Sequence, residues 1–175
     1  GSLEARQSTG FFRPRLQPLG FEVTYSHFDA TIANRTEVGR NVLAFKRGRS
    51  PEILVVMAHY DTARPTSQGA MDNGSGIGAL VELGRALATA PLRHSLLLVA
   101  SDGEEWGMLG AADFANSYPD RDRIAAVLSL DYLAPGELGW GARIRRGRPP
   151  AACAARSSVP RWSGSPTPIW DCSRG

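Results

Sequence analysis

Cysteine is missing from the first 140 residues of this 175-residue chain, since Cys153 and Cys172 both lie beyond them. This absence excludes a disulfide framework and a thiolate-based zinc site from that part of the chain. No apolar run approaches the length of about 20 residues that a membrane-spanning helix needs, and we therefore expect no membrane span. No internal repeat is visible. The chain opens with Gly-Ser rather than Met and shows no signal peptide, which leaves the compartment open.

An excess of positive charge is also missing from residues 1–140, which hold 13 Lys and Arg against 16 Asp and Glu. The basic balance of the whole chain comes from residues 141–175, with seven Arg against one Asp. A basic charge confined to a tail is poor evidence for a nucleic-acid interface, and we predict no nucleic-acid partner.

That tail is rich in Arg, Pro, Ser and Gly and has almost no periodic apolar pattern. Such a segment buries too little surface to offset its ordering entropy. We therefore expect one domain over residues 1–140 and a disordered tail, without paired strands, over residues 141–175. An equally open interpretation is that the tail derives from a shifted reading frame in a GC-rich message.

Three short apolar runs predict buried strands, at Ile53–Ala58, Ser95–Ala100 and Ala125–Leu130. Helical periodicity between them predicts helices over Ser75–Ala88 and Met108–Asn116. Continuous apolar strands that alternate with helices are typical of a parallel sheet covered on both faces. The predicted class is therefore α/β.

The region before these strands has a different pattern. Alternating residues predict strands at Phe21–Tyr25 and Asn41–Lys46, which we expect to form an antiparallel edge of the same sheet. A helix can begin at Leu3, but Gly10 and Pro14 are expected to prevent a long one.

Four polar segments follow, or lie close behind, the predicted parallel strands: His59-Tyr-Asp61, Asp72-Asn-Gly-Ser-Gly76, Asp102-Gly-Glu104-Glu105 and Ser129-Leu-Asp131. In open α/β sheets, ligands bind beyond the carboxyl ends of the strands. We therefore expect these side chains to converge on one edge. Carboxylate oxygens gathered around an imidazole suit a hydrolytic zinc site.

Each segment also has a simpler interpretation. Asp72 in an Asp-Asn-Gly sequence can serve as a helix-capping turn, and a strand-end Asp131 can cap a turn. Adjacent Glu104 and Glu105 can form an exposed acidic turn, and His59 alone can be structural. The glycines at 74, 76 and 78 depart from the Gly-x-Gly-x-x-Gly spacing of a dinucleotide-binding loop, which disfavours that interpretation.

Taken together, the order and spacing of the four segments resemble the co-catalytic zinc aminopeptidases. That family shares its fold with glutamate carboxypeptidase, glutaminyl cyclase and the transferrin receptor ectodomain. The resemblance extends from about residue 40 to residue 136 and is absent from residue 141 onward. It implies a three-layer α/β/α fold with a mixed, mainly parallel central sheet.

The resemblance also implies a set of metal ligands. One zinc would bind His59, Asp72 and Asp131, and a second would bind Asp72, Glu105 and a further histidine, with Asp72 as the bridge. It further implies a cis peptide bond between Asp72 and Asn73.

Two more residues receive roles in proton transfer and orientation. By the same resemblance, Glu104 would be the general base, which takes a proton from the metal-activated water and passes it to the leaving amine. Asp61 would hold the His59 imidazole in its metal-binding tautomer.

The chain departs from the family pattern in its histidines, which stand only at positions 27, 59 and 94. None matches the family's last ligand, which lies well downstream of Asp131. We therefore expect a catalytic domain truncated after Asp131, with its C-terminal part missing, that retains one zinc and has impaired activity.

The predicted function is zinc-dependent hydrolysis of N-terminal peptide bonds, with a peptide bearing a free N-terminus as substrate. Two alternatives remain open: a glutaminyl cyclase-like acyltransferase, and a catalytically silent interaction domain of the same fold. By analogy with the family, we expect a secreted or periplasmic protein. The substrate side chain and the oligomeric state are left open.

Overall fold

The computed structural model describes residues 3–32, 35–63, 68–133, 154–156 and 169–171. Residues up to Glu137 group into one compact unit, and residues from Leu138 onward into another. Among the described residues, no helix combines the length and the apolar character needed to cross a membrane.

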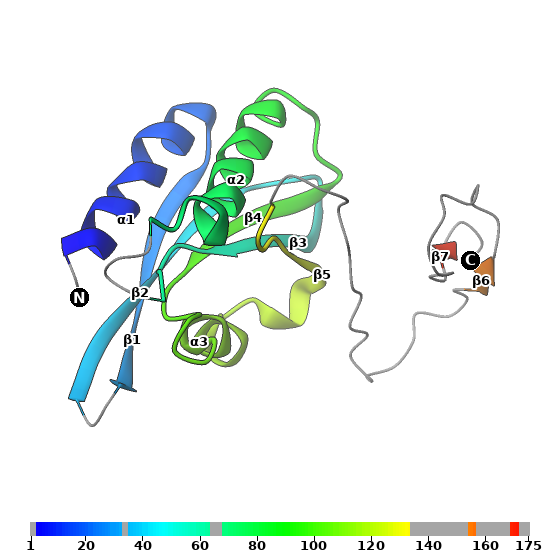
Figure 1. Cartoon of the computed structure of the whole chain (residues 1–175). Coiled ribbons are helices and arrows are strands. Elements are labelled where there is room, and N and C mark those ends of the chain that lie inside the picture. Colours follow the sequence, from blue (N-terminus) through cyan, green and yellow to red (C-terminus); the bar gives the residue numbers. More distant parts are fainter. Residues whose placement is uncertain (1–2, 33–34, 64–67, 134–153, 157–168, 172–175) are drawn as a thin grey trace, which may run out of the picture. The chain divides into compact units, whose positions relative to one another are not determined.

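The first unit is built on a five-stranded mixed sheet with the order β1-β2-β4-β3-β5 (Figure 1). Strands β4, β3 and β5 run parallel to one another, and the β1–β2 hairpin joins β4 in antiparallel orientation. This confirms the predicted antiparallel edge beside a parallel group. The strand bounds are β1 Glu22–Ile32, β2 Arg35–Lys46, β3 Ser50–His59, β4 His94–Ser101 and β5 Ile124–Ser129.

Helices cover both faces of this sheet. Helices α1 (Leu3–Leu16) and α2 (Ser75–Ala86) lie on one face, and α3 (Leu109–Ser117) lies on the other. Alternate residues of a strand point to opposite faces. Val56 and Leu98 accordingly pack with Phe12 and Leu80, whereas Val55 and Val99 pack with Phe114. The predicted three-layer α/β/α fold is confirmed.

The expectation that Gly10 and Pro14 prevent a long first helix is wrong. Helix α1 is 14 residues long and contains both residues. Burial outweighs the local penalties, because Phe12 and Leu16 are only 1% and 0% exposed in the core beneath α2. Each such side chain contributes about 1.5–3 kcal/mol on burial. Pro14 removes the backbone hydrogen bond that position 14 would donate to the carbonyl of Gly10, but only two residues of α1 follow it.

The hairpin is longer than the alternating pattern predicted. Strands β1 and β2 have 11 and 12 residues and stay in register from Glu22–Phe45 to Ile32–Arg35. The outer third of β2, from Arg35 to Val38, is exposed, so no apolar alternation marks it in the sequence. Backbone pairing between the two strands extends them beyond the core.

The tail contains two short strands, contrary to the expectation of no paired strands there. Strand β6 (Ala154–Arg156) pairs antiparallel with β7 (Ile169–Asp171). Ile169 and Trp170 are residue types that favour strands. The rest of residues 141–175 lies outside the described residues, and the boundary at residue 140 stays a prediction.

Candidate metal centre

The site is organised around His59, the last residue of β3, which pairs with Ser101 at the end of β4. The residue is only 4% exposed. Nδ1 lies 3.1 Å from the backbone carbonyl oxygen of Asp61 and 3.4 Å from the Asp61 carboxylate. A carbonyl oxygen only accepts hydrogen bonds, so we assign the ring proton to Nδ1. The lone pair of Nε2 then points away from Asp61.

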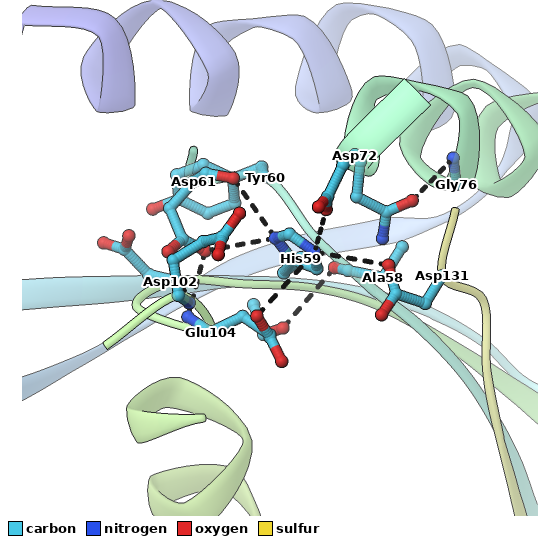
Figure 2. A network of polar contacts seen from close by, with 12 residues as sticks. Ala58, His59, Tyr60, Asp61, Asp72, Gly76, Asp102, Glu104 and Asp131 are labelled. Carbon is cyan, nitrogen blue, oxygen red and sulfur yellow. Dashed lines mark hydrogen bonds and ion pairs between the residues drawn. The ribbon is translucent and has the colours of Figure 1, made fainter. Parts of the chain in front are cut away.

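Three carboxylates lie around Nε2. Their nearest oxygens are 3.1 Å away in Asp72, 3.5 Å away in Asp131 and 4.0 Å away in Glu104. Figure 2 shows Asp61 on one side of the imidazole, with Asp72 and Asp131 on the other. Nε2 is buried, yet it makes no hydrogen bond among the described residues. A buried polar atom without a partner needs an explanation.

The distances around Nε2 fit a shared metal ion. Two ligand atoms, each about 2.1 Å from a tetrahedral zinc, lie about 3.4 Å apart. The separations of 3.1 Å to Asp72 and 3.5 Å to Asp131 lie on either side of that value. In addition, His59, Asp72 and Glu105 each offer one ligand atom, and these atoms lie within 4.8 Å of one another. The residues therefore fit zinc, which accepts one imidazole together with carboxylates.

Asp61 contacts more of the site than the imidazole. Its two carboxylate oxygens accept hydrogen bonds from the backbone N–H groups of Glu104, at 3.0 Å, and Glu105, at 3.1 Å. Burial favours the neutral carboxyl, but the hydrogen bonds from His59 and from these two N–H groups outweigh it and lower the pKa of Asp61. One carboxylate thus orients the imidazole and the segment that carries both glutamates.

The charges at the site shift two further pKa values. Burial lowers the pKa of His59, but the hydrogen bond to Asp61 and the negative charges of Asp61, Glu104 and Asp131 raise it to about 9. Burial raises the pKa of Glu104. His59 opposes this change, whereas the charges of Asp131, Glu105 and Asp61 add to it. A carboxylate with a raised pKa is a better proton acceptor near neutral pH.

Asp72 lies in an irregular turn, Ala70–Gly74, directly before α2. The peptide bond between Asp72 and Asn73 is cis, which confirms the expectation from the family resemblance. Asn73 is 1% exposed, and its side-chain oxygen accepts a hydrogen bond from the backbone N–H of Gly76 at 3.1 Å. The turn therefore presents Asp72 at the site and places Asn73 inside the protein.

Asn41, a residue that the sequence analysis did not single out, holds the segment that carries Glu104 and Glu105. Asn41 of β2 is fully buried. Its side-chain nitrogen donates to the carbonyl of Gly110 at 2.9 Å, and its oxygen accepts from the N–H of Asp102 at 3.1 Å. These bonds hold both ends of the segment that includes Glu104 and Glu105. An asparagine inside a strand carries no sequence signal for this contact.

The other two histidines lie away from the site. His94 begins β4, at the end of the sheet opposite His59, and its Nδ1 lies 3.0 Å from Glu52. His27 is exposed on β1. The other five predicted site residues all lie in the described part of the chain and around His59: Asp61, Asp72, Glu104, Glu105 and Asp131. Their roles as ligands, base and orienting group stay predictions.

The fold and these motifs agree with a comparison of the sequence with known families. Residues 41–147 match the family described as "Peptidase family M28". The chain belongs to this peptidase family. The match includes every residue of the candidate metal centre. The match agrees with the resemblance found from the four motifs, and it continues to residue 147, so the expectation that the resemblance is absent from residue 141 onward is wrong.

Two curated relatives show how far the likeness extends. The alkaline phosphatase isozyme conversion protein of Escherichia coli is 29% identical over an alignment of 154 residues that covers 74% of this chain and 45% of that protein. Aminopeptidase YwaD of Bacillus subtilis is 32% identical over an alignment of 89 residues that covers 49% of this chain and 19% of that protein. The chain thus spans less than half the length of these relatives.

Solved structures agree on the fold. A Zn-dependent exopeptidase from Parabacteroides distasonis superposes with a TM-score of 0.67 at 18% identity, covering 76% of this chain and 55% of that one. The glutaminyl cyclase of Porphyromonas gingivalis superposes with a TM-score of 0.63 at 24% identity, covering 74% and 57%. The fold of this chain is therefore that of zinc exopeptidases and glutaminyl cyclases.

Proposed function

We propose that this chain carries the metal centre of a zinc-dependent aminopeptidase, which hydrolyses the first peptide bond of a substrate with a free N-terminus. The observation that carries the proposal is the buried Nε2 of His59. It makes no hydrogen bond to any residue that the structure describes, and it lies 3.1 and 3.5 Å from the carboxylates of Asp72 and Asp131. Membership of peptidase family M28 supports a hydrolytic role for this arrangement.

In this proposal, His59, Asp72 and Asp131 would hold the retained zinc, and Glu105 lies within reach as a further ligand. Bound zinc would supply Lewis-acid polarisation of the scissile carbonyl and lower the pKa of a water molecule. Glu104 accepts a proton from that water through its carboxylate and donates it to the leaving amine. Its distance of 4.0 Å from Nε2 leaves it beside the ligands.

We further propose that the chain binds one zinc ion with useful affinity. His59 is the only one of its three histidines that lies at the site. A second ion would rely on carboxylates alone among the described residues, and zinc sites normally include nitrogen or sulfur ligands. The proposed secreted or periplasmic location and the lack of a nucleic-acid partner remain predictions.

Elemental analysis and turnover together test this function. We expect about one zinc per chain, a His59→Ala variant that loses it, and a His94→Ala control that keeps it, because His94 lies at the other end of the sheet. Glu104→Gln should retain zinc but lose hydrolysis of a leucyl anilide by a factor of about 100 or more. Glu82→Gln, at an exposed position of α2, should change neither.

The outcomes separate the metal site from the reaction. A chain without zinc would contradict the proposal entirely, and a zinc-loaded chain that hydrolyses no N-terminal peptide bond would contradict the aminopeptidase activity. Retained hydrolysis in Glu104→Gln would contradict its role as base. A peptide with N-terminal Gln belongs in the same assay, because glutaminyl cyclases share this fold. Cyclisation without hydrolysis would replace the proposal with acyl transfer.

A further inference from the structure

The turn that carries Asp72 also holds the segment that carries Asp131. Asp131 follows β5, and the last sheet-type hydrogen bond before it runs from the N–H of Leu130 to the carbonyl of Met57 at 2.7 Å. Asp131 itself is exposed, and Tyr132 has a left-handed backbone with φ of 47°. A non-glycine residue in that conformation needs support from its surroundings.

Asn73 supplies the first support. Its side-chain nitrogen donates to the carbonyl oxygen of Leu130 at 2.9 Å, immediately before Asp131. Its side-chain oxygen is already bound to the N–H of Gly76 in the first turn of α2. Both ends of the buried amide are therefore used. A Cβ at position 76 would lie 2.4 Å from that oxygen, so the contact also requires glycine there.

Ser75 supplies the second support. Its hydroxyl donates to the carbonyl of Met71 at 2.6 Å and accepts a hydrogen bond from the N–H of Leu133 at 3.0 Å. Met71 precedes Asp72, and Leu133 follows Asp131 by two residues. The Ser75 hydroxyl thus connects the backbone just before Asp72 with the backbone just after Asp131.

We propose that Asn73 and Ser75 form a clamp, in which they act as positioning residues that hold Asp131 opposite Asp72 at the Nε2 of His59. The inference rests on the proposed zinc site and deepens it. It gives a physical role to four of the five residues of the Asp72–Gly76 motif: Asp72 as a ligand, Asn73 and Ser75 as positioning side chains, and Gly76 where the buried amide leaves no room for a Cβ. Residues that orient metal ligands typically change metal affinity by about 10–100-fold when replaced.

Ser75→Ala is the direct test, and Ser117→Ala is its matched control. Ser117 on α3 makes the same kind of bond to the carbonyl four residues earlier, Asp113, at 2.8 Å, but it lies outside the site. We expect Ser75→Ala to weaken zinc binding about 10-fold in a chelator competition assay. Ser117→Ala should leave it unchanged, and Ser75→Thr, which keeps the hydroxyl, should restore most of the affinity.

Asn73→Asp tests the other half of the clamp. The substitution keeps the side-chain size and an oxygen for Gly76, but it removes the donor to Leu130. The added negative charge would by itself strengthen cation binding. A weaker affinity for zinc therefore reports the lost positioning, and an unchanged or tighter affinity would contradict the role of Asn73.

A double-mutant cycle with Asp131→Ala distinguishes positioning from a general effect on the fold. If Ser75 acts through Asp131, Ser75→Ala should have no further effect on zinc affinity once Asp131 is gone. His59, Asp72 and Glu105 remain to bind the ion. Equal weakening in both backgrounds, or wild-type affinity in Ser75→Ala, would overturn the clamp. A wild-type chain that binds no zinc would instead overturn the proposed function.

Discussion

At the scale of single residues, the site depends on whether the Nε2 atom of His59 binds a proton or a metal ion. The imidazole of His59 lies among carboxylates that favour its charged form, so its pKa is raised to about 9 despite burial. A zinc ligand must be the neutral imidazole. A proton and a metal ion therefore compete for Nε2 of His59. The negative charges of the neighbouring carboxylates stabilise either cation there.

This competition predicts opposite effects of pH on the metal-free and zinc-bound proteins. Without metal, the raised pKa of His59 stabilises the fold fully below the ordinary value of about 6.5, and this stabilisation is lost as pH rises to about 9. Zinc affinity should instead rise over the same range, by up to about tenfold per pH unit. Thermal unfolding without zinc and chelator competition, both from pH 6.5 to 9, measure the two effects.

Calorimetric titration in two buffers of different ionisation enthalpy provides the control. Near pH 7.5 it should show close to one proton released per zinc bound by the wild type, and the same by His94→Ala. Zinc binding without proton release would show that His59 is already neutral in the metal-free protein.

At the scale of elements, two glycines of α2 show how packing decides whether alanine in place of glycine stabilises or destabilises the protein. Gly78 and Gly84 lie in the same helix, where Ala is favoured over Gly by about 1 kcal/mol in isolation. A Cβ at Gly78 meets nothing within 4 Å. A Cβ at Gly84 would lie 2.4 Å from the side chain of Leu16 on α1, which is fully buried. The two positions differ in their neighbours, not in helix preference.

We therefore predict that Gly78→Ala stabilises the protein by about 0.5–1 kcal/mol and that Gly84→Ala destabilises it by roughly 1–2 kcal/mol. The second substitution forces α1 away from α2 at Leu16. Urea unfolding of the two variants measures the difference. Equal stabilisation by both would mean that α1 yields without cost and that Leu16 is not closely packed.

The same contact explains why the first helix was mispredicted. The low helix propensities of Gly10 and Pro14 argue against a long helix. The neighbouring sequence does not show which residues Phe12 and Leu16 pack against. One partner, Leu80 on α2, is distant in the sequence, and another, Phe21, lies after the turn that precedes β1. By contrast, α2 and α3 begin and end within two residues of their predicted bounds, because both their periodicity and their flanking strands agree.

At the scale of the whole molecule, strand β5 is unusual because its side chains are apolar but largely exposed to solvent. Its sequence is that of a strand buried on both faces, yet Val127 and Leu128 are 53% and 56% exposed. Among the described strands, β5 pairs with β3 on one side and has no partner on the other. An apolar edge strand of this kind promotes association between chains.

The chain should therefore self-associate through β5 at high concentration. Val127→Lys should lower this association markedly, whereas Val38→Lys, at an equally exposed position (53%) on the hairpin, should not. Sedimentation velocity over a range of concentrations measures the effect. Equal loss in both variants, or a monomeric wild type throughout, would contradict a role for the β5 edge.

The sequence by itself determined the α/β class, the parallel strands and the six residues that gather at the strand ends. It could do so because apolar strand patterns and the residues that follow them are local, and because parallel strands end at one edge of a sheet. Only the tertiary structure decided the length of α1, the exposure of β5, and the contacts of Asn41, Asn73 and Ser75. Those depend on hydrogen bonds and packing between segments far apart in the chain, which no local pattern encodes.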